Sequence, residues 1–188
     1  LKGSDTAAVV SGLSLGTTAT STSNVGSYII SASGGTADNY TITHIGSLLS
    51  ITKRPITVTA TTTTKVYDGT TSSRTLPTIS SGILTSGDMV TLSQTYDTRD
   101  VGTGKKVTPL ATINKGPNNY DITYFTATGE ITPKALTMSG LSVPTSKVYD
   151  GTTATVISGT AALQTAETAG TGTTADGKPY TNDTVSIA

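Results

Sequence analysis

The residues with the most chemical potential lie in one heptapeptide, Lys-Val-Tyr-Asp-Gly-Thr-Thr, which occurs unchanged at 65–71 and at 147–153. Its aromatic ring, carboxylate and hydroxyls are groups that bind a sugar or Ca²⁺. Because Ca²⁺ takes about six to eight oxygen ligands, Asp68 and Thr70 are too few unless distant loops contribute. The alternative is a tight turn, since Asp bonds its own downstream amide and Gly accepts a positive φ. We favour the turn, and the repeated motif residues are Tyr67, Asp68, Gly69, Thr70, Tyr149, Asp150, Gly151 and Thr152.

Other ionisable residues are too sparse to form a catalytic or metal site. The segment Asp97–Asp100 could hold a cation, but a solvated turn with a surface ion pair is the better interpretation. His44 is the single imidazole and the chain has no Cys, which argues against zinc and triad chemistry. Glu130 and Glu167 are the only glutamates, so a paired-carboxylate hydrolase is not expected. We predict no enzyme, no catalytic residue, no cofactor and no metal ligand, with Ca²⁺ and a Lys–Asn or Lys–Asp isopeptide bond as open alternatives.

Composition narrows the class of partner. The 188 residues hold 12 Lys and Arg and 12 Asp and Glu, so the net charge is zero and no nucleic-acid partner is expected. No run of about 18 apolar residues is present, which predicts no membrane insertion. Without Cys there are no disulfides and no thiol chemistry. No signal peptide is evident and the chain starts with Leu1, so we expect a piece of a longer protein.

The elements that position these residues are predicted to be strands. Thr, the commonest residue, is β-branched and favours strands. Apolar residues alternate with polar ones in four stretches: Ile56, Val58 and Ala60; Val90 and Leu92 before Tyr96; Val107, Ala111 and Ile113; and Tyr120, Ile122 and Tyr124. Pro109 is expected to interrupt the third strand at an edge or a bulge. A helical turn is allowed only at Ala161–Ala169, so the fold class is all-β.

The repeat divides the chain into modules. The two heptapeptides start at Lys65 and Lys147, an offset of 82 residues, and Asn39–Thr43 matches Asn119–Thr123 at an offset of 80. Residues 182–187 resemble 87–92, which predicts a strand that follows an insertion at about 167–181. We therefore predict the back half of one module at 1–54, a complete module at 55–134 and the front half of another at 135–188.

The connectors between these modules are short. Only Lys53–Pro55 separate Thr52 from Ile56, and the passage from Thr132 to Leu136 is equally tight. Pro55 fixes its own φ and holds the residue before it extended. We predict that the modules join end to end as an elongated, semi-rigid rod, with the heptapeptide as the turn after the first strand of each.

These motifs carry a resemblance to known repeats. The central part of the chain resembles the YDG domain, through the pattern ITKRPITVTATTTTKVYDGTT followed by SGD, DVGTGKKVT, NYDITY and GEITPKAL. Residues 1–52 are similar to the C-terminal part of an MBG repeat. Such repeats occur in filamentous-haemagglutinin-like bacterial adhesins exported by two-partner secretion. The resemblance implies β-grasp-like modules in a secreted adhesin at the bacterial cell surface, associated with the outer membrane. It implies no catalytic residue.

Two functions follow from this reading. The first is a structural stalk module that spaces a binding domain from the cell and supports cell–cell, biofilm-matrix or host attachment, with neighbouring repeats of the same chain as partners. The alternative is a module that binds extracellular polysaccharide or a host glycan, because Tyr and Asp-bearing turns can stack on sugars and bond their hydroxyls.

Overall fold

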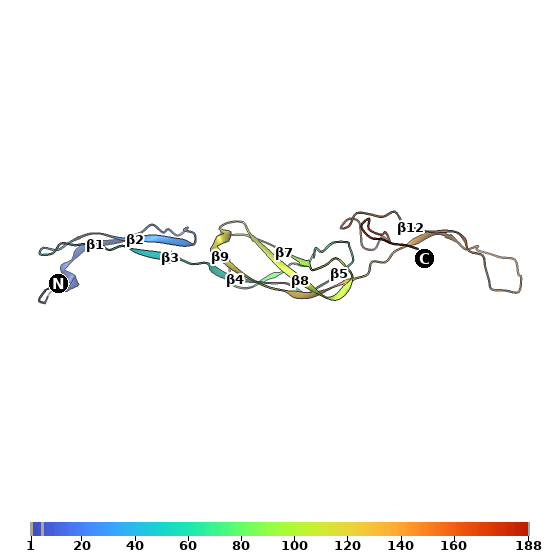
Figure 1. The fold of residues 1–188 in the computed structure, drawn as a ribbon, viewed down its shortest axis with the longest axis horizontal. Helices are drawn as coiled ribbons and strands as arrows, with labels where there is room; N and C mark the ends of the chain where they lie inside the picture. Colours follow the sequence, from blue (N-terminus) through green and yellow to red (C-terminus); the bar gives the residue numbers. More distant parts are fainter. Residues whose placement is uncertain (1, 5, 188) are drawn as a thin grey trace. The chain divides into compact units, whose positions relative to one another are not determined.

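The chain is built from β-strands in the part described by a computed structural model, residues 2–4 and 6–187 (Figure 1). This part contains no α-helix, and its helical segments are two 3₁₀ turns, η1 (Ala7–Val9) and η2 (Pro117–Asn119). None of the described helical segments is long and apolar enough to cross a membrane. The prediction of an all-β protein is confirmed.

The described residues form twelve strands in four sheets. The strands are β1 (Ser11–Thr17), β2 (Gly26–Thr36), β3 (Ser47–Ile51), β4 (Arg54–Thr59), β5 (Thr63–Val66), β6 (Thr78–Ser81), β7 (Val90–Tyr96), β8 (Gly102–Ile113), β9 (Tyr120–Phe125), β10 (Ala127–Thr132), β11 (Met138–Ser142) and β12 (Ser158–Leu163). The sheet orders are β1-β2-β3, β5-β10-β8-β7, β6-β4-β9 and β11-β12. Most pairs are antiparallel, whereas β5 runs parallel to β10.

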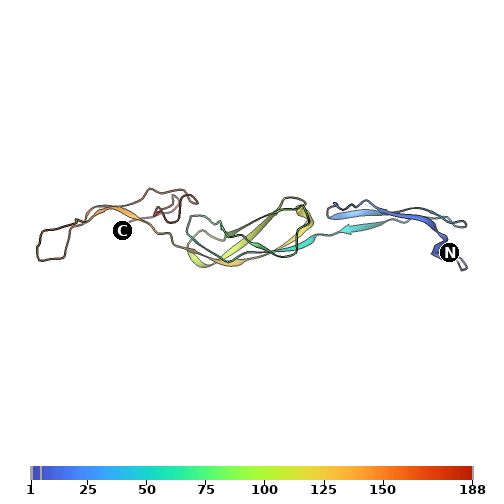
Figure 2. The same ribbon diagram turned by 180° about the vertical axis from the view of Figure 1, so that it is seen from behind.

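The N-terminal sheet is thin. β2 is its central strand and pairs antiparallel with β1 and with β3, as both views of the ribbon show (Figures 1 and 2). No residue of these three strands is buried, and Leu13 and Leu15 on β1 are exposed. A sheet without a buried residue gains little from apolar burial, so its stability rests on the ladder hydrogen bonds and neighbouring segments.

The chain divides into two compact units, each with its own small core. The first unit comprises residues 1–57, 81–91 and 112–123, and its buried cluster is Ile56, Ile113 and Tyr120. The second comprises residues 58–80, 92–111 and 124–188, and its buried cluster is Ala60, Tyr96, Val107 and Ile131, with Tyr67 and Ala127 packed against it. These cores use the alternating residues that the sequence singles out.

A buried glutamine on β7, Gln94, binds the backbone of Thr61 between β4 and β5. The Gln94 amide is 2% exposed; its Oε1 accepts from Thr61 N at 2.9 Å and its Nε2 donates to Thr61 O at 2.9 Å. The side chain thus satisfies the backbone of residue 61 as a neighbouring strand would. The turn of the heptapeptide follows β5, which ends with Lys65 and Val66 and is the second strand of the predicted module 55–134, so the prediction that this turn follows the first strand is wrong.

Three local predictions are corrected. β8 runs unbroken through Pro109, which lies beyond the residues of β8 that pair with β10, so its missing N–H costs no bond to that neighbour. The pairing of β8 with β10 shifts register between Gly129 and Ile131, where β8 uses one residue more (Gly102–Lys105) than β10, so the irregularity lies in β8 but away from Pro109. Residues 161–163 belong to β12 and no helical turn forms at Ala161–Ala169. Residues 182–187 form no strand, because Asp183 is engaged in the contacts described below.

Candidate functional site

The first heptapeptide is a turn braced by its own lysine. Asp68 Oδ1 accepts from Lys65 Nζ at 2.6 Å, from Thr70 N at 2.9 Å and from Thr70 Oγ1 at 2.9 Å. The same ammonium donates to Thr70 O at 2.7 Å and to Ser72 O at 3.0 Å. Gly69 has φ +74°, a conformation that residues with a Cβ rarely adopt. Lys65, Asp68, Gly69 and Thr70 therefore hold the turn together.

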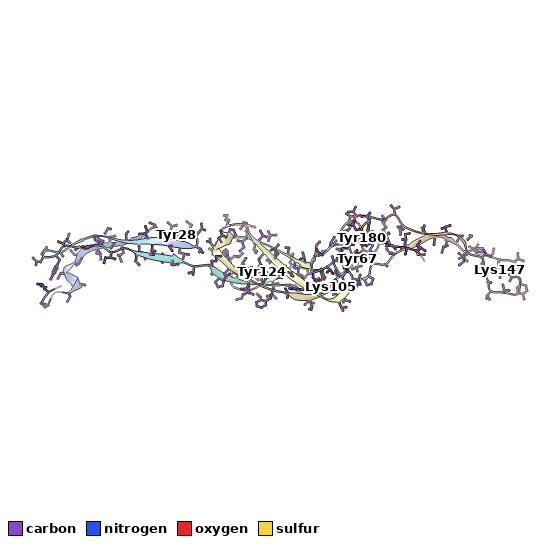
Figure 3. The ribbon with its side chains drawn as sticks, viewed as in Figure 1. Tyr28, Tyr67, Lys105, Tyr124, Lys147 and Tyr180 are labelled. Carbon is purple, nitrogen blue, oxygen red and sulfur yellow. The ribbon has the colours of Figure 1, made fainter. Side chains whose placement is uncertain are left out.

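The second heptapeptide has the same internal geometry. Asp150 Oδ1 accepts from Lys147 Nζ at 2.8 Å and from Thr152 N and Oγ1 at 2.9 Å each, and Gly151 has φ +75°. Figure 3 shows Lys147 on the loop that projects beyond β11 and β12. Since the two copies have different surroundings, the turn is encoded within the seven residues themselves.

This geometry leaves little room for Ca²⁺ at the turn. The Lys65 ammonium already lies on the Asp68 carboxylate, where a metal ion would have to bind. Burial alone would raise the pKa of Asp68, but the hydrogen bonds from Lys65 and Thr70 outweigh it and lower the pKa. Within the described residues there is no group of three or more acidic or His side chains that could hold a metal ion.

A distant segment covers the first turn, and we call residues Thr168–Asp183 the cover segment. Gly170 N donates to Asp68 O at 2.8 Å, and the Tyr67 hydroxyl donates to Asp183 Oδ1 at 2.7 Å. The Tyr67 and Tyr180 rings meet edge to face with centroids 5.8 Å apart, and Figure 3 shows them together. Tyr67 packs against the core of the second unit, and its hydroxyl binds a carboxylate.

A buried lysine anchors the base of the cover segment. The Lys134 side chain is 3% exposed, and its Nζ lies 2.8 Å from Glu167 Oε1, 2.9 Å from Asp176 Oδ1 and 4.1 Å from the centroid of the Tyr180 ring. The hydrogen bond from Lys134 is the main cause that lowers the pKa of Asp176. Burial alone would lower the pKa of Lys134, but its bonds to Glu167 and Asp176 raise it.

This lysine cluster bears on the isopeptide alternative. Forming an amide from a Lys and an Asp needs a neutral amine and a neutral acid, whereas the shifts in pKa favour both ions. The geometry therefore supports an ion-pair network between Lys134 and Asp176. Sequence reasoning missed this cluster because Glu167 and Asp176 lie in the insertion, which no other module in the chain repeats.

The remaining candidates lie apart. Asp97 accepts from Thr98 N at 2.9 Å in a turn, as expected, but Arg99 pairs with Asp183 at 3.3 Å. The predicted ion pair therefore exists with a partner outside the tetrapeptide, and it adds to the contacts of the cover segment. His44 is exposed, with Nε2 2.8 Å from Gly34 O.

Replacing Asp68 by alanine is expected to destabilise the second unit by about 2 kcal/mol. The change removes three hydrogen bonds and leaves the Lys65 ammonium without its carboxylate. Asp150→Ala is the matched control, because the same bonds are lost from an exposed turn, and a smaller loss is expected. Urea unfolding of both variants measures the difference, and an unchanged Asp68→Ala midpoint would contradict a structural role for the motif.

Alkaline pH is expected to loosen the cover segment. Burial and the hydrogen bond to Asp183 raise the pKa of Tyr67 from 10.0 to about 12. Because the folded pKa is the higher one, the contribution of neutral Tyr67 is complete below about pH 10 and is lost as pH rises toward 12. The stability difference between wild type and Tyr67→Phe should therefore shrink across that window. Urea titrations at stepped pH measure it, and a constant difference would refute the assignment.

Comparison with known families gives two matches. The MBG domain (YGX type) matches residues 1–50, and the YDG domain matches residues 52–128. No curated protein and no solved structure matches the chain. Domains of these two types fit an adhesin-like surface protein. The module boundaries 1–54, 55–134 and 135–188 stay a prediction. The chain therefore contains an MBG domain followed directly by a YDG domain.

Proposed function

We propose that this chain is a stalk segment of a large bacterial surface adhesin and that its modules hold a binding domain away from the cell. The proposal includes export by two-partner secretion, display at the outer membrane and attachment to cells, biofilm matrix or host. No catalysis is assigned to the chain. The observation that carries the proposal is the tie between the cover segment and the YDG turn, since it joins the predicted module 135–188 to the module 55–134.

Four contacts support a mechanical role for this tie. Lys134 follows β10 by two residues and is held by Glu167 and Asp176. Asp183 then accepts from Tyr67 and pairs with Arg99. A pull on the chain from beyond Asp183 therefore meets ion pairs and hydrogen bonds before it reaches the strands. The Lys134 side chain is shielded from solvent, and buried ion pairs resist separation more than exposed ones do.

The connector to the preceding domain supports the same role. β3 ends at Ile51 and β4 begins at Arg54, so two residues join the MBG and YDG strands. A flexible linker of Gly and Ser lets neighbouring domains reorient, whereas a connector this short restricts them. A spacer that restricts reorientation keeps its two ends apart, as a stalk must.

Small-angle scattering of the whole chain tests the stalk. A single compact domain of 188 residues would have a radius of gyration of about 16 Å. We expect a value at least about one and a half times larger, unchanged between low and high salt. A radius close to that of a compact domain would refute the stalk.

A second candidate function is binding of a polysaccharide or host glycan, and one cavity favours this function. A cavity of about 500 Å³ lies beside the first turn and is lined among others by Lys65, Asp68, Arg74, Thr171 and Tyr180. Hydroxyls, charges and one aromatic ring are groups that bind sugars. A glycan array with the whole chain, with and without Ca²⁺, tests it. Arg74→Ala should abolish any signal from this cavity, and an array without signal removes the candidate.

A further inference from the structure

The two copies of the heptapeptide differ in what touches them. The first copy is occupied by the cover segment at three points: the Asp68 carbonyl, the Tyr67 hydroxyl and the open face of Gly69. A Cβ on Gly69 would lie 2.6 Å from the Ala169 Cβ, so that face is filled by the Ala169 methyl. The absence of a side chain at Gly69 therefore lets the cover segment approach.

The second copy offers the same surface with nothing on it. Tyr149 is 93% exposed and Val148 is 89% exposed. A Cβ on Gly151 would meet no atom within 4 Å. The hydroxyl, the carbonyl and the glycine face that receive the cover segment at the first turn are thus all presented again.

We propose that Lys147–Thr153 is a docking site for a segment of the Thr168–Asp183 type, supplied by another YDG module. The occupant presents a small residue to Gly151 and a glycine N–H to the Asp150 carbonyl. It also presents an aromatic edge and a carboxylate to Tyr149. These are the groups that Ala169, Gly170, Tyr180 and Asp183 present to the first turn.

The vacant site is already in its binding conformation. The glycine φ differs by one degree between the copies, and the Thr-to-Asp bonds have the same lengths. A preformed turn lowers the ordering cost when a partner binds, which favours association. Between modules of one chain the local concentration reaches the millimolar range, so an affinity in that range is enough.

A synthetic peptide of residues 164–185 tests the proposal on the isotopically labelled whole chain by NMR. We expect saturable shifts of the Tyr149, Gly151 and Thr152 resonances at peptide concentrations up to about 1 mM. Tyr149→Ala in the chain, or Asp183→Ala in the peptide, should reduce the shifts at least about tenfold. No saturable shift, or equal shifts with the altered peptide, would overturn the proposal.

A second measurement uses the whole chain without the peptide. Tyr67→Ala removes the hydroxyl and the ring that hold the cover segment, so this segment becomes available to Tyr149 of a second copy. We expect the Tyr67→Ala chain to dimerise in sedimentation equilibrium and the Tyr67→Ala/Tyr149→Ala chain to stay monomeric. Equal behaviour of the two chains would count against the docking site. Neither result depends on the radius of gyration that tests the stalk.

Discussion

Gly69→Ala is expected to lower the free energy of unfolding by about 3 kcal/mol, and Gly151→Ala by about 1 kcal/mol. Both glycines have a left-handed backbone, with φ of +74° and +75°, so an added Cβ strains both turns equally. The extra loss at Gly69 arises because its Cβ would lie 2.6 Å from the Ala169 Cβ and 3.3 Å from the Ala169 Cα. No such neighbour exists at Gly151.

The collision at Gly69 is with the cover segment and not with the turn. To relieve it, Ala169 must withdraw, and the bond from Gly170 N to Asp68 O is then stretched or lost. A hydrogen bond of this kind contributes about 1 kcal/mol, and separation of Tyr180 from Tyr67 adds a similar amount. Backbone strain and loss of docking therefore add at Gly69, whereas strain acts alone at Gly151.

A double variant separates the two causes. Gly69→Ala/Ala169→Gly restores the space that the new methyl needs, so the loss should fall to that of Gly151→Ala. Urea unfolding of wild type, Gly69→Ala, Ala169→Gly and the double variant measures the coupling. Equal losses at Gly69 and Gly151 would show that the cover segment contributes no stability at the first turn.

The contrast between the two copies shows what the sequence can and cannot predict. The turn is predictable, because its bonds join residues no more than seven positions apart and both copies repeat them. The cover segment is not, since Tyr67 and Gly170 are more than a hundred residues apart and the heptapeptide is the same whether covered or exposed. Only the structure assigns Tyr67 a partner and leaves Tyr149 exposed.

The strands were also predictable only in part: alternation finds apolar core residues, but not polar residues that are buried by distant contacts. Alternation identified Ile56, Val58 and Ala60 because their side chains face a core, and they are buried. Gln94 escaped detection, since a polar residue in a strand is expected to face solvent, and its burial depends on the backbone of Thr61. The likeness of residues 182–187 to 87–92 predicted a strand, but Asp183 binds Tyr67 and Arg99 there.

Lys134→Met is expected to lower the free energy of unfolding by on the order of 3 kcal/mol, which is more than is expected for Lys147→Met. The methionine keeps much of the aliphatic stem but removes the ammonium from Glu167, Asp176 and the Tyr180 ring. Two carboxylates then face each other without a cation, and a partly buried charge that loses its partner is strongly destabilising. The base of the cover segment is expected to open.

Lys147→Met is the matched control. Lys147 pairs with Asp150 at 2.8 Å, a distance like that from Lys134 to Glu167, but its side chain is 31% exposed against 3%. Water replaces much of what an exposed pair loses, so only a small fraction of the Lys134→Met effect is expected. Equal effects of the two substitutions would show that burial adds nothing to the Lys134 network.

Stability measured at acid pH distinguishes the ion-pair contribution of Lys134 from the contribution of its packing. The pKa of Asp176 is lowered in the folded chain, chiefly by the hydrogen bond from Lys134. A carboxyl with a depressed folded pKa stabilises the fold above its unfolded pKa of 3.8, and this contribution is lost as pH falls toward the folded value. The difference between wild type and Lys134→Met should thus be full near neutral pH and shrink below about pH 4. If urea titrations show a difference that is independent of pH, Lys134 acts through packing on Tyr180 and the ionic anchor of the cover segment is refuted.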